Sequence, residues 1–168
     1  GAAAEWGGCR EEVTRNYLAE GRFAEAATAF KAAKLEGELD RKQRTALIFL
    51  CKASEKFLDD LTATLGPGAN GVDVTTRLGT RFTQIIGSQK GGLMVEKNGA
   101  ARSLTWKEIG PLSLLLLHRI LVEASENERQ KEARLLQSAA FAWLNDLKPE
   151  AGGMAQELIV LKPSFAVT

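Results

Sequence analysis

The sequence predicts a mostly helical α+β domain, in which a small antiparallel β-hairpin insertion around residues 80–105 interrupts a helical bundle. Apolar residues recur every three or four positions before residue 65 and again after residue 111. Between residues 74 and 105 the pattern changes to short alternating runs separated by glycines. The first pattern is typical of amphipathic helices and the second of strands. A length of 168 residues fits one domain, expected at residues 8–168.

Composition narrows the function classes. The chain is 45% hydrophobic and 26% charged, which is typical of folded proteins. Its net charge of +1 gives no broad basic surface, so we expect no nucleic-acid partner. The longest apolar run, residues 112–117, is interrupted by Ser113 and is shorter than a membrane span. With no signal peptide in view, these features favour the cytoplasm.

Residues 1–7 are rich in glycine and alanine and are predicted to be a flexible leader or a tag remnant. Gly1 stands where a complete chain would begin with Met, which indicates an excised piece of a larger protein. Trp6 lies in this leader, and we expect it to pack against something outside the piece.

Residues 10–37 are predicted to form a helical hairpin, with helices at 11–20 and 22–36 separated by Gly21. A set of aromatic and small residues falls at the spacing of a tetratricopeptide repeat (TPR): Tyr17, Gly21, Phe23, Ala26, Phe30 and Ala33. The segment therefore resembles a TPR motif. The resemblance implies that Ala26 and Ala33 let two antiparallel helices approach closely. It also implies that later helices complete a TPR-like helical bundle.

The next helix is predicted at residues 41–65 and carries a continuous stripe of inward-facing residues: Leu47, Cys51, Ser54, Leu58, Leu61 and Leu65. Cys51 lies in this stripe, so we expect a buried thiol and no disulfide with Cys9. The string at residues 66–71 has the form G-x-G-x-x-G. It follows a helix and precedes a strand, the reverse of a dinucleotide-binding unit, so we interpret it as a flexible connector.

Strands are predicted at residues 81–86, 93–97 and 102–105. Asn98-Gly99 favours a type I′ turn, which would pair Lys97 with Ala100, Val95 with Arg102 and Leu93 with Leu104. Leu93, Val95 and Leu104 would then share one face. The glycine-rich residues 87–92 lack the ending of a phosphate-binding loop and are interpreted as a hairpin loop.

The rest of the chain is predicted to be helical. Thr105 and Glu108 have capping-box spacing, and Pro111 suits the first turn of a helix at 112–125. That helix is apolar nearly all round, which places it at the centre of the domain. A helix at 127–147 has a predicted inner face of Leu136, Ala140, Trp143, Leu144 and Leu147. Gly152-Gly153 weakens the last helix, at 150–161.

The order of these parts is similar to helical segments that accompany bacterial serine/threonine kinases and other large modular bacterial proteins. The shared features are a hairpin that ends in Trp106, a leucine-rich buried helix and an alanine-rich helical pair. This resemblance implies an accessory or regulatory segment in a signalling protein of that type.

Possible catalytic groups are few. His118 is the only histidine, so no two-histidine metal site can form, and we interpret it as a core residue. An enzyme would need His118 or Cys51 beside a carboxylate in a polar pocket. The carboxylate pairs, including Asp59-Asp60, are interpreted as solvated charge. The basic residues Arg41, Lys42 and Arg44 leave an RNA-binding alternative.

We therefore predict no catalytic, cofactor-binding or metal-binding residues and no cofactor. The favoured function is a non-catalytic protein–protein interaction or scaffold module, with a protein or peptide as partner. The partner would bind either a helical groove or an edge of the hairpin, at residues 81–86 or 102–105. The alternatives are a kinase-associated regulatory segment, a small enzyme with a dispersed active site, and an RNA-binding helical domain.

Overall fold

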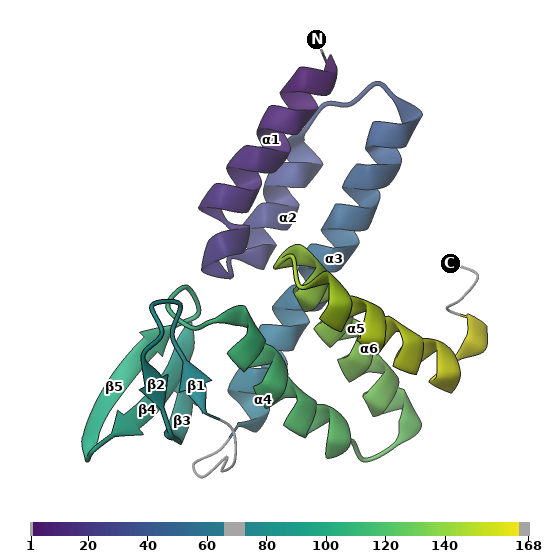
Figure 1. The fold of residues 1–168 in the computed structure, drawn as a ribbon. Helices are drawn as coiled ribbons and strands as arrows, with labels where there is room; N and C mark the ends of the chain where they lie inside the picture. The colour runs from purple at the N-terminus through teal and green to yellow at the C-terminus, as the bar shows by residue number, and fades with distance from the viewer. Residues whose placement is uncertain (1, 66–72, 165–168) are drawn as a thin grey trace.

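The fold is mostly helical, and the computed structural model describes residues 2–65 and 73–164 (Figure 1). Within these residues an N-terminal helical arm leads into a body made of a small β region and three further α-helices. The mostly α, α+β prediction is confirmed. The predicted connector at residues 66–71 lies outside the described residues.

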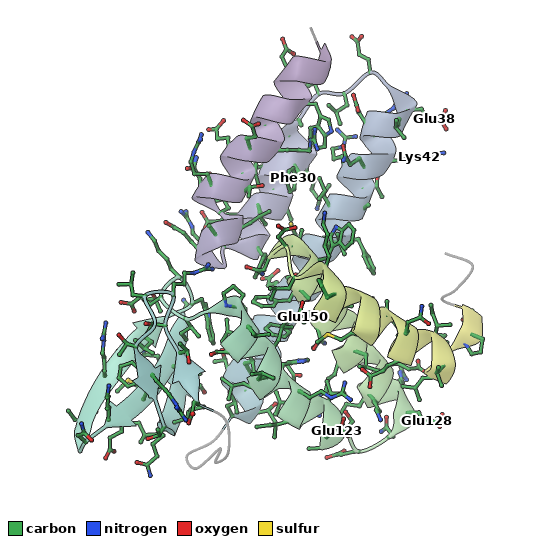
Figure 2. All side chains as sticks on the ribbon, in the orientation of Figure 1. Phe30, Glu38, Lys42, Glu123, Glu128 and Glu150 are labelled. Carbon is green, nitrogen blue, oxygen red and sulfur yellow. The ribbon has the colours of Figure 1, made fainter. Side chains whose placement is uncertain are left out.

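The arm begins with α1 (Ala2–Asn16), a 3₁₀ turn (Leu18–Glu20) and α2 (Phe23–Ala32). Gly21 separates the turn from α2 with φ 74°, a conformation that favours glycine. The hairpin is thus present, although both of its helices end earlier than predicted. Phe23, Ala26 and Phe30 are buried, and Phe30 lies inside the arm (Figure 2).

The leader prediction is corrected, because residues 2–7 belong to α1. Trp6 is only 2% exposed and meets the Phe30 ring edge-on at 5.9 Å. Its indole N–H donates a hydrogen bond of 2.7 Å to Oε1 of Gln43. An apolar ring with a satisfied N–H is stable inside the arm, so Trp6 packs within this chain rather than against an outside partner.

The long helix α3 (Glu38–Thr64) runs from the arm into the body (Figure 1). Its predicted stripe is confirmed, since Cys51, Ser54, Leu58 and Leu61 are buried. Both cysteines are free, as predicted. In the body Phe57 stacks on Phe141 with ring centroids 4.1 Å apart. This contact joins α3 to the C-terminal helices.

The β region has a two-stranded sheet, β1 (Val74–Thr75) and β2 (Arg81–Phe82), and a three-stranded one. The latter contains β3 (Gln84–Gln89), β4 (Gly92–Lys97) and β5 (Ala100–Thr105), all antiparallel. The β4–β5 register has all three predicted pairs, and Asn98 and Gly99 have φ 54° and 81°. Leu93, Val95 and Leu104 share one face of the hairpin, as predicted, and are fully buried.

Two β-region predictions are corrected. The strand predicted at 81–86 is divided at Thr83 into β2 and the start of β3. The loop predicted at 87–92 is reduced to a turn at Lys90-Gly91, because Gly87 and Gly92 both belong to strands. Glycine is required at position 92, where β4 approaches the backbone of β5 closely.

Replacement of Gly92 by alanine is expected to destabilise the protein. A Cβ there would lie 1.8 Å from the carbonyl oxygen of Leu104, so the hairpin must shift. We expect a loss of at least about 1–3 kcal/mol in the free energy of unfolding, measured by chemical denaturation. Gly87→Ala is the matched control, because a Cβ at Gly87 meets nothing within 4 Å. Equal stability of the two variants would contradict the close approach.

Three helices follow: α4 (Pro111–Glu123), α5 (Glu128–Leu144) and α6 (Lys148–Leu161). Pro111 occupies the first turn of α4, as predicted. The capping-box contact also forms, since Glu108 accepts a 2.8 Å hydrogen bond from the Thr105 N–H. It closes a separate turn instead of starting the helix, because Ile109 first bridges to Thr76.

The buried faces of α4 and α5 differ in part from the predictions. On α4, Leu114, Leu115 and Leu117 are buried, whereas Leu112 and Leu116 are about half exposed, so the helix is not enclosed on all sides. On α5, Trp143 is 51% exposed and lies beside Lys148, which corrects its assignment to the core. Phe141 fills the core instead, by packing against Phe57 and Phe23.

Candidate functional site

A buried polar cluster connects three helices of the body. His118 of α4 is fully buried, and its Nδ1 lies 2.6 Å from the hydroxyl of Ser138 on α5. Its Nε2 lies 3.1 Å from Oδ2 of Asp60 on α3. Arg134 of α5 donates to the same oxygen at 3.1 Å and to the carbonyl of Leu121 at 2.6 Å. We call Asp60, His118, Arg134 and Ser138 the polar cluster.

The electrostatics of the polar cluster favour a neutral histidine and an ionised aspartate. Burial lowers the pKa of His118, and the Asp60 carboxylate only partly opposes this. Burial alone would raise the pKa of Asp60, but hydrogen bonds from His118 and Arg134, together with the charge of Arg134, lower it overall. Neutral His118 can donate from Nε2 to Asp60 and accept at Nδ1 from the Ser138 hydroxyl. Both ring nitrogens are then satisfied.

Serine, histidine and aspartate in contact are also the components of a nucleophilic triad. A nucleophile must be reachable by its substrate, whereas Ser138 is 1% exposed and His118 is fully buried. In this structure the polar cluster therefore holds α3, α4 and α5 together and offers no open reaction site.

Sequence reasoning placed His118 in the core correctly but missed its partners. Asp60 was interpreted as solvated charge, yet it lies in the polar cluster with its side chain 18% exposed. It is 58 positions from His118, and Ser138 is 20 positions away, so no local spacing indicates either contact. One sequence feature could have indicated a buried polar contact on this helix. Arg134 and Ser138 are polar residues one helical turn apart, beside the apolar Leu135.

The polar cluster predicts a pH-dependent stability. Because the pKa of His118 in the folded protein is below its ordinary value of 6.5, the unfolded chain binds more protons as the pH falls below that value. The free energy of unfolding is then expected to decrease toward pH 5, by up to about 1.4 kcal/mol per pH unit. Denaturant unfolding of the wild type and His118→Gln across this range checks it. An equally steep dependence in the variant would contradict the assignment.

The other candidate residues named from the sequence, Cys51 and the basic residues of α3, are not part of the polar cluster. Cys51 is fully buried, and burial raises the pKa of its thiol to about 12, which makes it inert. Of the basic residues, Lys42 pairs with Glu38 at 3.5 Å (Figure 2), and Arg44 donates to the carbonyl of Ala33 at the end of α2. Arg41 is exposed. Two of these three side chains are therefore engaged by other groups of the chain.

The outer edge of β5 is open. Trp106 N–H bonds to the Gly91 carbonyl, whereas Thr105 N–H bonds to Glu108 and not to β4. Backbone groups alternate along a strand, so Ala101 and Ser103 direct their N–H and C=O groups away from β4. No described strand pairs with them, and β5 lies at the outer side of the sheet in Figure 1.

The opposite edge of the sheet is contacted by the end of α3. Ser88 of β3 donates its hydroxyl to the carbonyls of Thr62 and Leu65, at 2.6 and 3.4 Å. These carbonyls belong to the end of α3 and the residue after it. Of the two hairpin edges named from the sequence, the one at residues 102–105 is the more exposed one, and it extends to Ala101.

A cleft of about 430 Å³ lies at the C-terminal end of β5, beside the β1–β2 turn. Three of its eight lining residues are basic, namely Arg77, Arg102 and Lys107, and Leu78 and Glu108 also line it. Arg102 pairs with Glu108 at 3.7 Å, and Lys107 with Glu20 at 3.1 Å. We call this the basic cleft. Arg102 of β5 lines this cleft, so the cleft lies beside the open edge.

Comparison with protein-family models, curated proteins and solved structures gave no match. Within the described residues, no helix combines the length and apolarity needed to cross a bilayer. The same residues contain no group of three or more histidine, cysteine, aspartate or glutamate side chains arranged to hold a metal ion. The function of the open edge and the basic cleft is therefore inferred from the structure of this chain.

Proposed function

We propose that this domain is a non-catalytic protein-binding module that receives an extended peptide segment as an added strand on β5. The open backbone at Ala101 and Ser103 is the observation that carries the proposal. Folded proteins commonly protect such edges with proline, lysine or a covering segment. Here the two residues whose backbone groups point outward have small side chains, whereas the opposite edge is contacted by the end of α3.

Strand addition suits this edge because the rest of the hairpin is rigidly anchored. Leu93, Val95 and Leu104 bury the inner face of β4 and β5 in the core. A peptide would therefore meet a preformed template, and its backbone hydrogen bonds would not require the sheet to rearrange first. This arrangement also suits an accessory segment of a larger signalling protein, the context that the second resemblance implies.

The other functions named from the sequence have less support. An RNA surface at residues 41–44 is weakened because Lys42 and Arg44 are engaged within the chain. A dispersed active site at His118 is weakened because the histidine and Ser138 are enclosed. A TPR-like helical groove stays an alternative, and exposed Phe49 on α3 would belong to it.

The test is a selection of peptides from a random library displayed on phage, using the folded domain as bait. The selected peptides are then measured against Ala101→Pro and Ala101→Ser. Proline removes the outward N–H but is tolerated on an edge strand, whereas serine keeps the N–H. We expect Ala101→Pro to weaken binding at least about tenfold and Ala101→Ser to leave it nearly unchanged.

Hydrogen exchange supplies a second measurement. Bound peptide should slow exchange at the amides of Ala101 and Ser103, because both become paired. Thermal unfolding confirms that Ala101→Pro is folded. Equal affinity of the proline and serine variants, with protection confined to α1–α3, would instead assign the peptide to the helical groove.

A further inference from the structure

We infer that the segment received at β5 is acidic, with a carboxylate on Arg77 and an apolar side chain beside Leu78. This inference deepens the proposed strand addition and rests on it. Its basis is the charge and apolar surface of the basic cleft, which the added strand would meet as it leaves the end of β5.

Arg77 is held in position without a counter-charge. Its Nε donates to the carbonyl of Lys107 at 2.8 Å, and its Nη2 lies 3.4 Å from the carbonyl of Ala19. Among the described residues no carboxylate pairs with it, unlike Arg102 and Lys107. Its backbone N–H also donates to the carbonyl of Glu108, which anchors the turn against the chain that follows β5.

A guanidinium that is preorganised in this way is well suited to a carboxylate. Two of its N–H groups already face backbone carbonyls, so the orientation of the fork is set before a ligand arrives. The remaining N–H groups can donate charge-assisted hydrogen bonds to a carboxylate. Arg102 and Lys107 add positive charge on the same side, although Glu108 and Glu20 partly neutralise them.

Leu78 supplies the apolar part of the same surface. It lies at the β1–β2 turn and is 96% exposed, the most exposed large hydrophobic side chain among the described residues. An exposed leucine next to an unpaired arginine fits a segment in which acidic and apolar residues alternate.

The experiment uses two short synthetic peptides, one of alternating valine and glutamate and one with glutamine in place of each glutamate. Binding to the folded domain is measured by fluorescence anisotropy at low and high salt. We expect the glutamate peptide to bind at least about tenfold more tightly at low salt and to lose this advantage at high salt. Arg77→Gln should reduce the advantage several-fold.

Matched variants separate the two proposals. Lys52→Gln removes an exposed charge on α3 and should leave the advantage intact. Ala101→Pro should weaken both peptides together, because it acts on the edge rather than on charge. If both peptides bind equally and both respond to Ala101→Pro, strand addition holds and the acidic inference is overturned. If neither peptide binds, both proposals fail.

A second copy of the chain is the competing occupant of β5. Sedimentation analysis of the wild type and Ala101→Pro tests it. We expect a monomer in both cases. A wild-type dimer that Ala101→Pro dissociates would assign the edge to self-association and overturn the acidic segment as its occupant.

Discussion

Phe57→Ala is expected to lower the free energy of unfolding by about 3–5 kcal/mol, as for other buried phenylalanines that are truncated to alanine. Phe57 is fully buried and lies between two rings, stacked on Phe141 at 4.1 Å and tilted against His118 at 4.3 Å. Its removal would leave a cavity where α3, α4 and α5 meet. Urea denaturation measures the change.

Phe49→Ala is the matched control for this experiment. Phe49 lies on the same helix but is 52% exposed, so its truncation should change stability by no more than about 0.5 kcal/mol. A large loss from both substitutions would show that Phe49 is also packed. A small loss from Phe57→Ala would contradict its central position.

Arg134→Met is expected to lower the free energy of unfolding by about 2–4 kcal/mol. The substitution preserves much of the side-chain volume but removes the cation that faces Asp60. The Asp60 side chain is 18% exposed, which moderates the penalty of leaving its charge unpaired. The Leu121 carbonyl also loses the Arg134 donor, although the Ser125 hydroxyl still donates to it at 3.3 Å. Chemical denaturation of the variant gives the value.

A double-mutant cycle tests the cause of this effect. Asp60→Asn with Arg134→Met removes both charges, so the combined loss should be smaller than the sum of the single losses. Arg129→Met, on the exposed side of the same helix, is the control and should have little effect. Strictly additive losses would contradict a direct interaction between Asp60 and Arg134.

Local chemistry made the β-hairpin predictable from the sequence. Asn98 and Gly99 adopt the positive φ angles that a type I′ turn needs, and that turn sets the register of every pair in β4 and β5. The stripe on α3 was predictable for a similar reason, because one helical period recurs from Cys51 to Leu61. Neither prediction depends on a distant segment.

Predictions failed where a distant segment decided the outcome. Residues 1–7 were predicted to be a flexible leader because they are rich in glycine and alanine. Trp6 is instead buried within the arm, where it contacts Gln43 and Phe30. Periodicity placed Trp143 in the core, whereas the rings of Phe57 and Phe23 select Phe141. Phe141 and Trp143 are two positions apart on α5, about 200° around the helix, so one choice excludes the other.

By itself, the sequence determined the helical and strand periods, the hairpin register and the burial of Cys51, because these follow from neighbours a few positions apart. The tertiary structure alone decided the polar cluster, the open edge of β5 and the basic cleft. Each of these brings together groups from separate elements, such as Asp60 with His118 and the β1–β2 turn with the end of β5. No local spacing encodes such a meeting, because it depends on how the elements pack.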